Sequence, residues 1–186
     1  MLKRFALPLV LAFALAPAAQ AAGGRYAFDG GTRAQRGQVA SALRASSFNW
    51  NLVPGRIVIH IGKGISSHAV AGQIWLDGRL LNTGRFSWGV VQHEYAHQVD
   101  FLVLSDPMRA QLQPLLLDTE WWGSIDQHSQ LGCERFADLL AWAYWQSPDN
   151  VMQPSSTTDE GGQIPPAAFR AALSALIQGT TSPQKG

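Results

Sequence analysis

The feature that most constrains the fold is the stretch of residues 90–105, which contains no glycine or proline. Apolar residues recur along it at a spacing that favours a helix with one buried side. Within it, His93 and His97 flank Glu94 in the pattern HExxH. Residues four apart share a helix face, so the two imidazoles can bind one ion beside the carboxylate. This set suits a zinc ion, with Glu94 as general base. Hydrogen-bonded core histidines are the alternative, which the ligand spacing disfavours.

A zinc ion held by two histidines needs a third protein ligand. The longer pattern HExxHxxGxxH is excluded, because Asp100 and Val103 occupy its last two defined positions. The other common source is a carboxylate on a later helix. In the predicted helix over residues 132–145, Glu134 and Asp138 lie four apart and therefore share a face. Two carboxylates in an apolar helix require a positively charged partner.

HEYAH at residues 93–97, followed by ExxxD at 134–138, resembles the gluzincin zinc metallopeptidases, the thermolysin-like clan. The resemblance implies a zincin-like α+β fold, in which a small antiparallel or mixed sheet precedes the HExxH helix and a mainly helical C-terminal part. It also implies that His93, His97 and Glu134 bind one catalytic Zn²⁺, with Glu94 as general base. Asp138 would hydrogen-bond a ligand histidine and so fix its tautomer.

The chain departs from the clan at Cys133, where an asparagine usually precedes the ligand glutamate. Asp100, three residues after His97, is therefore the candidate for orienting that ring. In this clan a tyrosine or histidine polarises the scissile carbonyl. The candidates for this role are His128 and Tyr144.

Two strands are expected before the helix, over residues 56–61 and 73–77. His60 is expected on the polar face of the first strand, and His68 in an exposed loop between them. In the clan, the strand before the helix is a sheet edge that binds the peptide substrate as an added antiparallel strand. By resemblance the substrate edge comprises Gly72, Gln73, Ile74, Trp75 and Leu76, and the alternative is an interior strand. Asn82 or Thr83 is expected to cap the helix.

The N-terminus has the pattern of a secretory signal peptide over residues 1–21. Lys3 and Arg4 precede an apolar run over residues 6–16, and Ala19-Gln20-Ala21 forms an A-x-A cleavage site. We expect an irregular leader over residues 22–32, one domain over 33–178 and a flexible tail over 179–186. The mature protein is expected outside the cytoplasm, without stable membrane insertion.

The expected activity is zinc-dependent hydrolysis of peptides or proteins. A net charge of +1, with no basic run, does not indicate a nucleic-acid partner. The single cysteine excludes an internal disulfide. The alternatives are a protein with a structural zinc ion and a peptide- or cell-wall-binding module with a peptidase-like fold. Glu94 argues against the first, because a structural site has no use for a carboxylate beside the ion. The complete ligand set argues against the second.

Overall fold

The computed structural model describes residues 23–116, 120–123, 130–154 and 164–181. In these residues the chain forms four strands and six α-helices, and it is mostly helical. The predicted α+β class, with a small mixed sheet ahead of the HExxH helix, is confirmed. The predicted signal peptide lies outside the described residues. Of the helices in the described part, none combines the length and apolar character that a bilayer crossing requires.

The elements follow one another in an order that separates the strands from most of the helices. They are β1 (Tyr26–Gly30), α1 (Arg33–Ala45), β2 (Ile57–Gly62), β3 (His68–Val70), β4 (Gln73–Asp77), α2 (Gly78–Leu81), α3 (Trp88–Leu102), α4 (Asp106–Leu112), α5 (Gly132–Tyr144) and α6 (Pro166–Thr181). Short 3-10 turns occur at Trp50–Leu52, Gly84–Ser87 and Gln113–Leu115. The strand predicted over residues 73–77 coincides with β4.

The sheet has the strand order β1-β2-β4-β3. The first three strands are parallel, and β3 runs antiparallel to β4. β1 falls in the region predicted to be an irregular leader, so that prediction was wrong. The glycines lie at the end of the strand instead of interrupting it: Gly30, its last residue, and Gly31, with φ of 77° and 72°, turn the chain into α1. β1 pairs with β2 along one side and forms one edge of the sheet.

The substrate edge predicted for residues 72–76 was also wrong, because β4 is an interior strand between β2 and β3. The three residues of β3, which were expected in a loop, fold back against β4 and occupy the edge. Gly72, with φ of 81°, provides the turn between the two strands. Ile74 and Leu76, on the face of β4 that meets the core, are 1% and 0% exposed, whereas Gln73, Trp75 and Asp77 on the opposite face are not buried.

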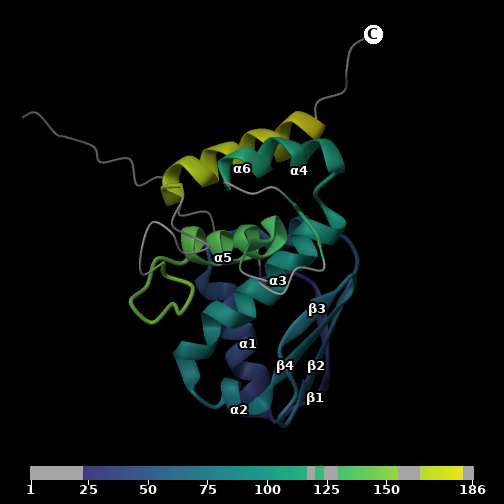
Figure 1. Ribbon diagram of the computed structural model, residues 1–186. Coiled ribbons are helices and arrows are strands. Elements are labelled where there is room, and N and C mark those ends of the chain that lie inside the picture. Colours follow the sequence, from purple (N-terminus) through teal and green to yellow (C-terminus); the bar gives the residue numbers. More distant parts are fainter. Residues whose placement is uncertain (1–22, 117–119, 124–129, 155–163, 182–186) are drawn as a thin grey trace, which may run out of the picture.

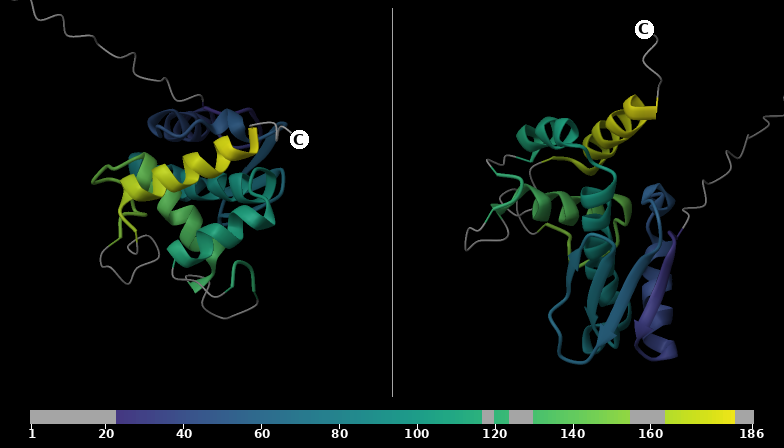
Figure 2. Two further views of the ribbon diagram at one scale, coloured as in Figure 1. Left: turned by 90° about the horizontal axis from the view of Figure 1, so that it is seen from above. Right: turned by 90° about the vertical axis from the view of Figure 1, so that its right-hand side faces the viewer.

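The core lies between one face of the sheet and the helices. Isoleucines of β2 and β4 point into it and join residues of α1, α3 and α5 in one buried cluster. Figure 1 shows α1 and α3 alongside the sheet, with α5 next to α3. In both Figure 1 and the right-hand view of Figure 2, α4 and α6 lie on the far side of α5 from the sheet. Helix α3 therefore joins the sheet to the C-terminal helices.

Helix α3 begins at Trp88, later than a cap at Asn82 or Thr83 would place its start, because residues 78–87 form helical turns of their own. Asn82 and Thr83 therefore do not cap it: the Thr83 hydroxyl donates to the carbonyl of Leu80 at 2.7 Å. Two side chains of α3 attach it to α1 instead. Trp88 Nε1 donates to Gln38 Oε1 at 2.8 Å, and Gln92 Nε2 donates to the Ala42 carbonyl at 2.8 Å.

Candidate metal centre

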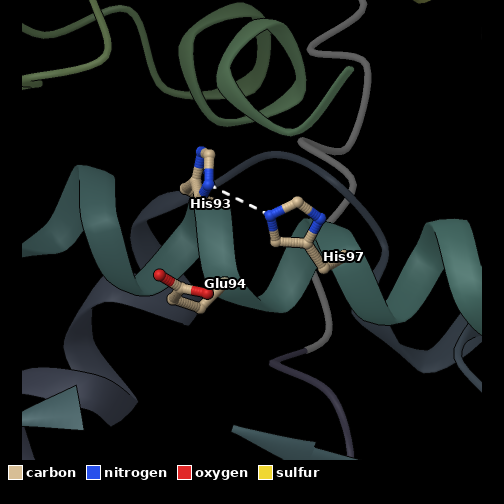
Figure 3. Close-up of side chains that lie close together, drawn as sticks. All are labelled: His93, Glu94 and His97. Carbon is tan, nitrogen blue, oxygen red and sulfur yellow. Dashed lines mark hydrogen bonds between the residues drawn. The ribbon is translucent and has the colours of Figure 1, made fainter. Parts of the chain in front are cut away.

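His93 and His97 lie one turn apart on α3, as their spacing predicts. Both rings project from the side of α3 that faces α5 (Figure 3). Their Nε2 atoms are 3.1 Å apart. Two imidazoles in this arrangement offer two lone pairs to one point, which is how a helix presents an i, i+4 histidine pair to a metal ion.

Glu134, in the first turn of α5, completes a triangle of donor atoms. Its Oε2 atom lies 3.3 Å from His93 Nε2 and 3.5 Å from His97 Nε2. Ligand atoms about 2 Å from a tetrahedral zinc ion are separated from each other by about 3.3 Å. The triangle therefore has the size of one face of such a coordination sphere, and its residues fit a small metal ion.

Glu94 stands beside this triangle. It is 5% exposed, and one of its carboxylate oxygens lies within 4.8 Å of a ring nitrogen of both His93 and His97. In Figure 3 its carboxylate comes off a different side of α3 from the two rings. A carboxylate in this position is close enough to exchange a proton with a molecule bound at the triangle. Of the two glutamates, Glu134 makes the shorter contacts with His93 and His97.

Asp138, one turn after Glu134 on α5, holds the His93 ring. Its Oδ1 atom accepts a hydrogen bond from His93 Nδ1 at 2.6 Å. With Nδ1 occupied as a donor, the lone pair of His93 is at Nε2, where it faces the triangle. A carboxylate behind an imidazole also makes the ring a better electron donor.

The electrostatics of the cluster favour a positive charge between the histidines and the carboxylates. Burial lowers the pKa of His93, but hydrogen bonds to Asp138 and Glu134 outweigh it and raise the pKa to about 10. Burial raises the pKa of Glu134, but hydrogen bonds from His93 and His97 lower it well below its usual range. Burial raises the pKa of Glu94, against the opposing effect of the two histidines. A metal cation would satisfy the same carboxylates.

The cluster opens into a cleft of about 460 Å³. One wall is formed by residues 66–69, at the beginning of β3, and another by the aromatic side chains of Phe101 and Trp122. His68, which was expected in an exposed loop, thus lies on the cleft wall. The sequence signal for the hairpin that brings His68 to the cleft was Gly72, which follows the apolar residues 69–71.

Gln98 is a site residue that sequence reasoning missed. It is fully buried, four residues after Glu94, on the side of α3 that faces the β3–β4 turn. Its Oε1 accepts from the Gly72 amide at 2.7 Å, and its Nε2 donates to the carbonyls of Val70 at 2.9 Å and Gln73 at 3.2 Å. A buried amide must find such partners. Gln98 therefore fixes the edge strand β3 to the helix that carries the candidate metal ligands.

Asp100 does not orient His97, so that prediction was wrong. Asp100 is fully buried and accepts hydrogen bonds from three side chains of later residues, namely Arg109 Nε at 2.8 Å, Trp121 Nε1 at 2.9 Å and Trp122 Nε1 at 3.1 Å. These donors attract its carboxylate away from His97. The His97 ring packs instead against Phe101, with ring centroids 6.0 Å apart. Asp100 thereby anchors the Trp122 wall of the cleft.

The two candidates for polarising a carbonyl have different outcomes. Tyr144 lies ten residues after Glu134, which places it about 15 Å further along α5. It packs against Phe48, with ring centroids 5.1 Å apart, and does not line the cleft. His128 lies outside the described residues.

Cys133 lines the cleft, and burial raises the pKa of its thiol to about 12.

No family model matches the chain, and neither a curated protein nor a solved structure matches it. Support for a function therefore comes from the geometry of His93, Glu94, His97 and Glu134 and from the cleft around them.

Proposed function

We propose that this protein is an exported zinc-dependent peptidase with a zincin-like fold, related in mechanism to the gluzincins. The observation that carries the proposal is the triangle of His93, His97 and Glu134, with Glu94 beside it at the bottom of an open cleft. Export is supported by the signal-peptide pattern of residues 1–21.

The residues of the triangle and the two carboxylates beside it have distinct tasks. His93, His97 and Glu134 would bind the ion, and Asp138 would keep the His93 ring in the productive tautomer. When bound, zinc supplies a Lewis acid that activates water and polarises a carbonyl at neutral pH. Glu94 takes the proton from the attacking water and delivers it to the leaving amine. Its burial suits this task, because a raised pKa brings a carboxylate closer to the working pH.

The substrate would bind along β3. This strand is one of the two edges of the described sheet, and its residues His68 and Ala69 line the cleft together with Glu94. An edge strand presents unpaired N–H and C=O groups, to which an extended peptide adds as a further antiparallel strand. Main-chain pairing would hold the scissile carbonyl near the triangle with little dependence on substrate sequence.

The test compares the mature chain with Glu94→Gln at equal zinc loading on a mixed peptide library. Glu94 stands outside the triangle, so Glu94→Gln should bind zinc like the wild type and lose turnover. Mass spectrometry of the products would give the cleaved bonds. Cleavage by Glu94→Gln at the wild-type rate would refute the assignment of the base. Zinc bound to both proteins without turnover in either would favour a structural ion, whose fourth ligand Cys133 could supply.

A further inference from the structure

The face of the sheet opposite the core carries a row of polar and aromatic side chains that crosses all four strands. In the register of the sheet, Asp29 on β1 is opposite His60 on β2, His60 is opposite Trp75 on β4, and Trp75 is opposite His68 on β3. Side chains of directly opposed residues lie on the same face and contact one another. These four residues therefore form one continuous row.

The three rings of the row are stacked. The ring centroids of His60 and Trp75 are 4.7 Å apart at an interplanar angle of 16°, and those of Trp75 and His68 are 4.7 Å apart at 1°. Neighbouring strands in a sheet are about 4.8 Å apart. The rings thus repeat with the spacing of the strands, and each new strand in register would place its side chain one ring further along.

Both ends of the stack are held in place. His60 Nδ1 bonds Asp29 Oδ2 at 2.8 Å, and its Nε2 bonds Gln73 Oε1 at 3.0 Å. At the other end, His68 Nδ1 donates to the Ser66 carbonyl at 2.9 Å. These bonds fix the planes of the outer rings without the substrate, so stacking on them costs little additional conformational entropy.

The row ends at the cleft. His68 is exposed, it belongs to the last strand of the described sheet, and it lines the same cleft as His93 and Glu94. A peptide that adds to β3 would therefore place one of its side chains beside the imidazole of His68, at the spacing that already separates the rings of the row.

We propose that His68 forms a substrate subsite that selects an aromatic side chain, which stacks on the imidazole and extends the row by one ring. This inference rests on the proposed peptidase function and adds a specificity to it. The preferred substrates are peptides with a phenylalanine, tyrosine or tryptophan at one fixed position relative to the scissile bond. An aromatic cross-strand pair should raise kcat/KM by about threefold to fivefold over alanine at that position.

The experiment uses end-blocked octapeptides of alanine and glycine, in which a single phenylalanine occupies each position in turn. For the zinc-loaded wild type, the ratio of kcat/KM between phenylalanine and alanine should be about threefold to fivefold at the position opposite His68. In His68→Ala this ratio should fall to about one. Preferences that the wild type shows at other positions should persist in His68→Ala and serve as the internal control.

The variant His68→Phe tests whether the preference depends on stacking or on the titratable nitrogens of the imidazole. It keeps a flat ring but has no titratable nitrogen, so it should retain the preference that His68→Ala loses. Thermal unfolding of both variants checks that β3 remains folded. An identical positional profile in wild type and His68→Ala would overturn the inference and leave the peptidase proposal standing, and so would a loss of the preference in His68→Phe. If the zinc-loaded wild type cleaves none of the peptides, the proposed function and this inference fall together.

Discussion

At the scale of single residues, the hydrogen bond between His93 and Asp138 should decide how tightly the candidate site binds zinc. Asp138 bonds His93 Nδ1 at 2.6 Å, and its side chain is only 15% exposed. Asp138→Asn keeps the size of the side chain but removes its negative charge, so the ring becomes a weaker ligand. We expect zinc affinity to fall about 10- to 100-fold. Competition with a fluorescent chelator measures this directly.

A matched control for this variant is Asp149→Asn. Asp149 forms an ion pair with Arg85 at 2.9 Å and takes no part in the cluster on α3 and α5. Its substitution should leave zinc affinity unchanged. Equal affinities for Asp138→Asn and the wild type would mean that Asp138 does not support His93 as a ligand.

Residue spacing predicted the arrangement of His93 and His97, because helical geometry is local. For Glu134 and Asp138, the sequence indicated a shared helix face and the need for a positive partner, and the resemblance implied that they approach the two histidines. The same reasoning failed for Asp100, whose partners Arg109 and Trp121 come from later segments. Spacing shows which side chains share a face of one element. It does not show which of several polar groups from other elements a buried carboxylate will contact.

At the scale of elements, Gln98 should control how the edge strand is held over the site. Gln98→Leu removes three hydrogen bonds to the β3–β4 turn, which should loosen β3 and raise KM for long peptides. Zinc affinity should not change. Hydrogen exchange at the Gly72 amide, which donates to Gln98 at 2.7 Å, should become faster.

Gln92→Leu is the control for this variant, because Gln92 is also a fully buried glutamine of α3. Its side chain bonds the Ala42 carbonyl of α1 instead of the β3–β4 turn. Both variants should lower stability, whereas only Gln98→Leu should raise KM. A parallel rise in KM for both would show that the effect comes from general destabilisation of α3.

The first turn of α3 depends on a close contact with residues 147–152. A Cβ added at Gly89 would meet the Asn150 side chain and would lie 3.2 Å from the Val151 amide nitrogen. Gly89→Ala should therefore lower the free energy of unfolding by about 1 to 3 kcal/mol. Gly37→Ala in α1, where a Cβ meets nothing within 4 Å, should raise it by about 0.5 to 1 kcal/mol. Urea unfolding measures both changes in the free energy of unfolding. If Gly89→Ala and Gly37→Ala changed it in the same direction, the close contact at Gly89 would be contradicted.

Elements with a strong local pattern were predicted well, and those defined by pairing were not. The alternating isoleucines of β2 and the apolar side of α5 can be recognised within their own segments. β1 and β3 lie among glycines, β3 has only three residues, and both strands are defined by their pairing with β2 and β4. Strand order is likewise a property of the whole sheet, so the last strand before α3 in sequence need not be the edge strand in space.

At the scale of the whole molecule, the candidate metal centre connects two parts of the fold. Helix α3 packs with the sheet and α1, while α5 packs with α6 (Figure 1). His93 and His97 come from the first part, and Glu134 and Asp138 from the second. Helices α3 and α5 already pack directly against each other, so an ion bound at the triangle would link them further, and its binding free energy would add to the stability of the folded chain.

This coupling should appear in the pH dependence of stability. Without metal, burial lowers the pKa of His93 but its carboxylate partners raise it to about 10, above its unfolded value of about 6.5. The stabilisation from the retained proton is complete below pH 6.5 and is lost as the pH rises toward 10. In EDTA, the free energy of unfolding should thus decrease between pH 7 and 9 by up to about 1.4 kcal/mol per pH unit. With zinc bound, His93 has no proton to lose at Nε2, and this decrease should be absent.

The difference in the free energy of unfolding between the zinc-loaded and the EDTA-treated protein should therefore widen as the pH rises, and His93→Gln should abolish the widening. Parallel curves for the EDTA-treated and zinc-loaded wild type would show that the ion does not replace the His93 proton.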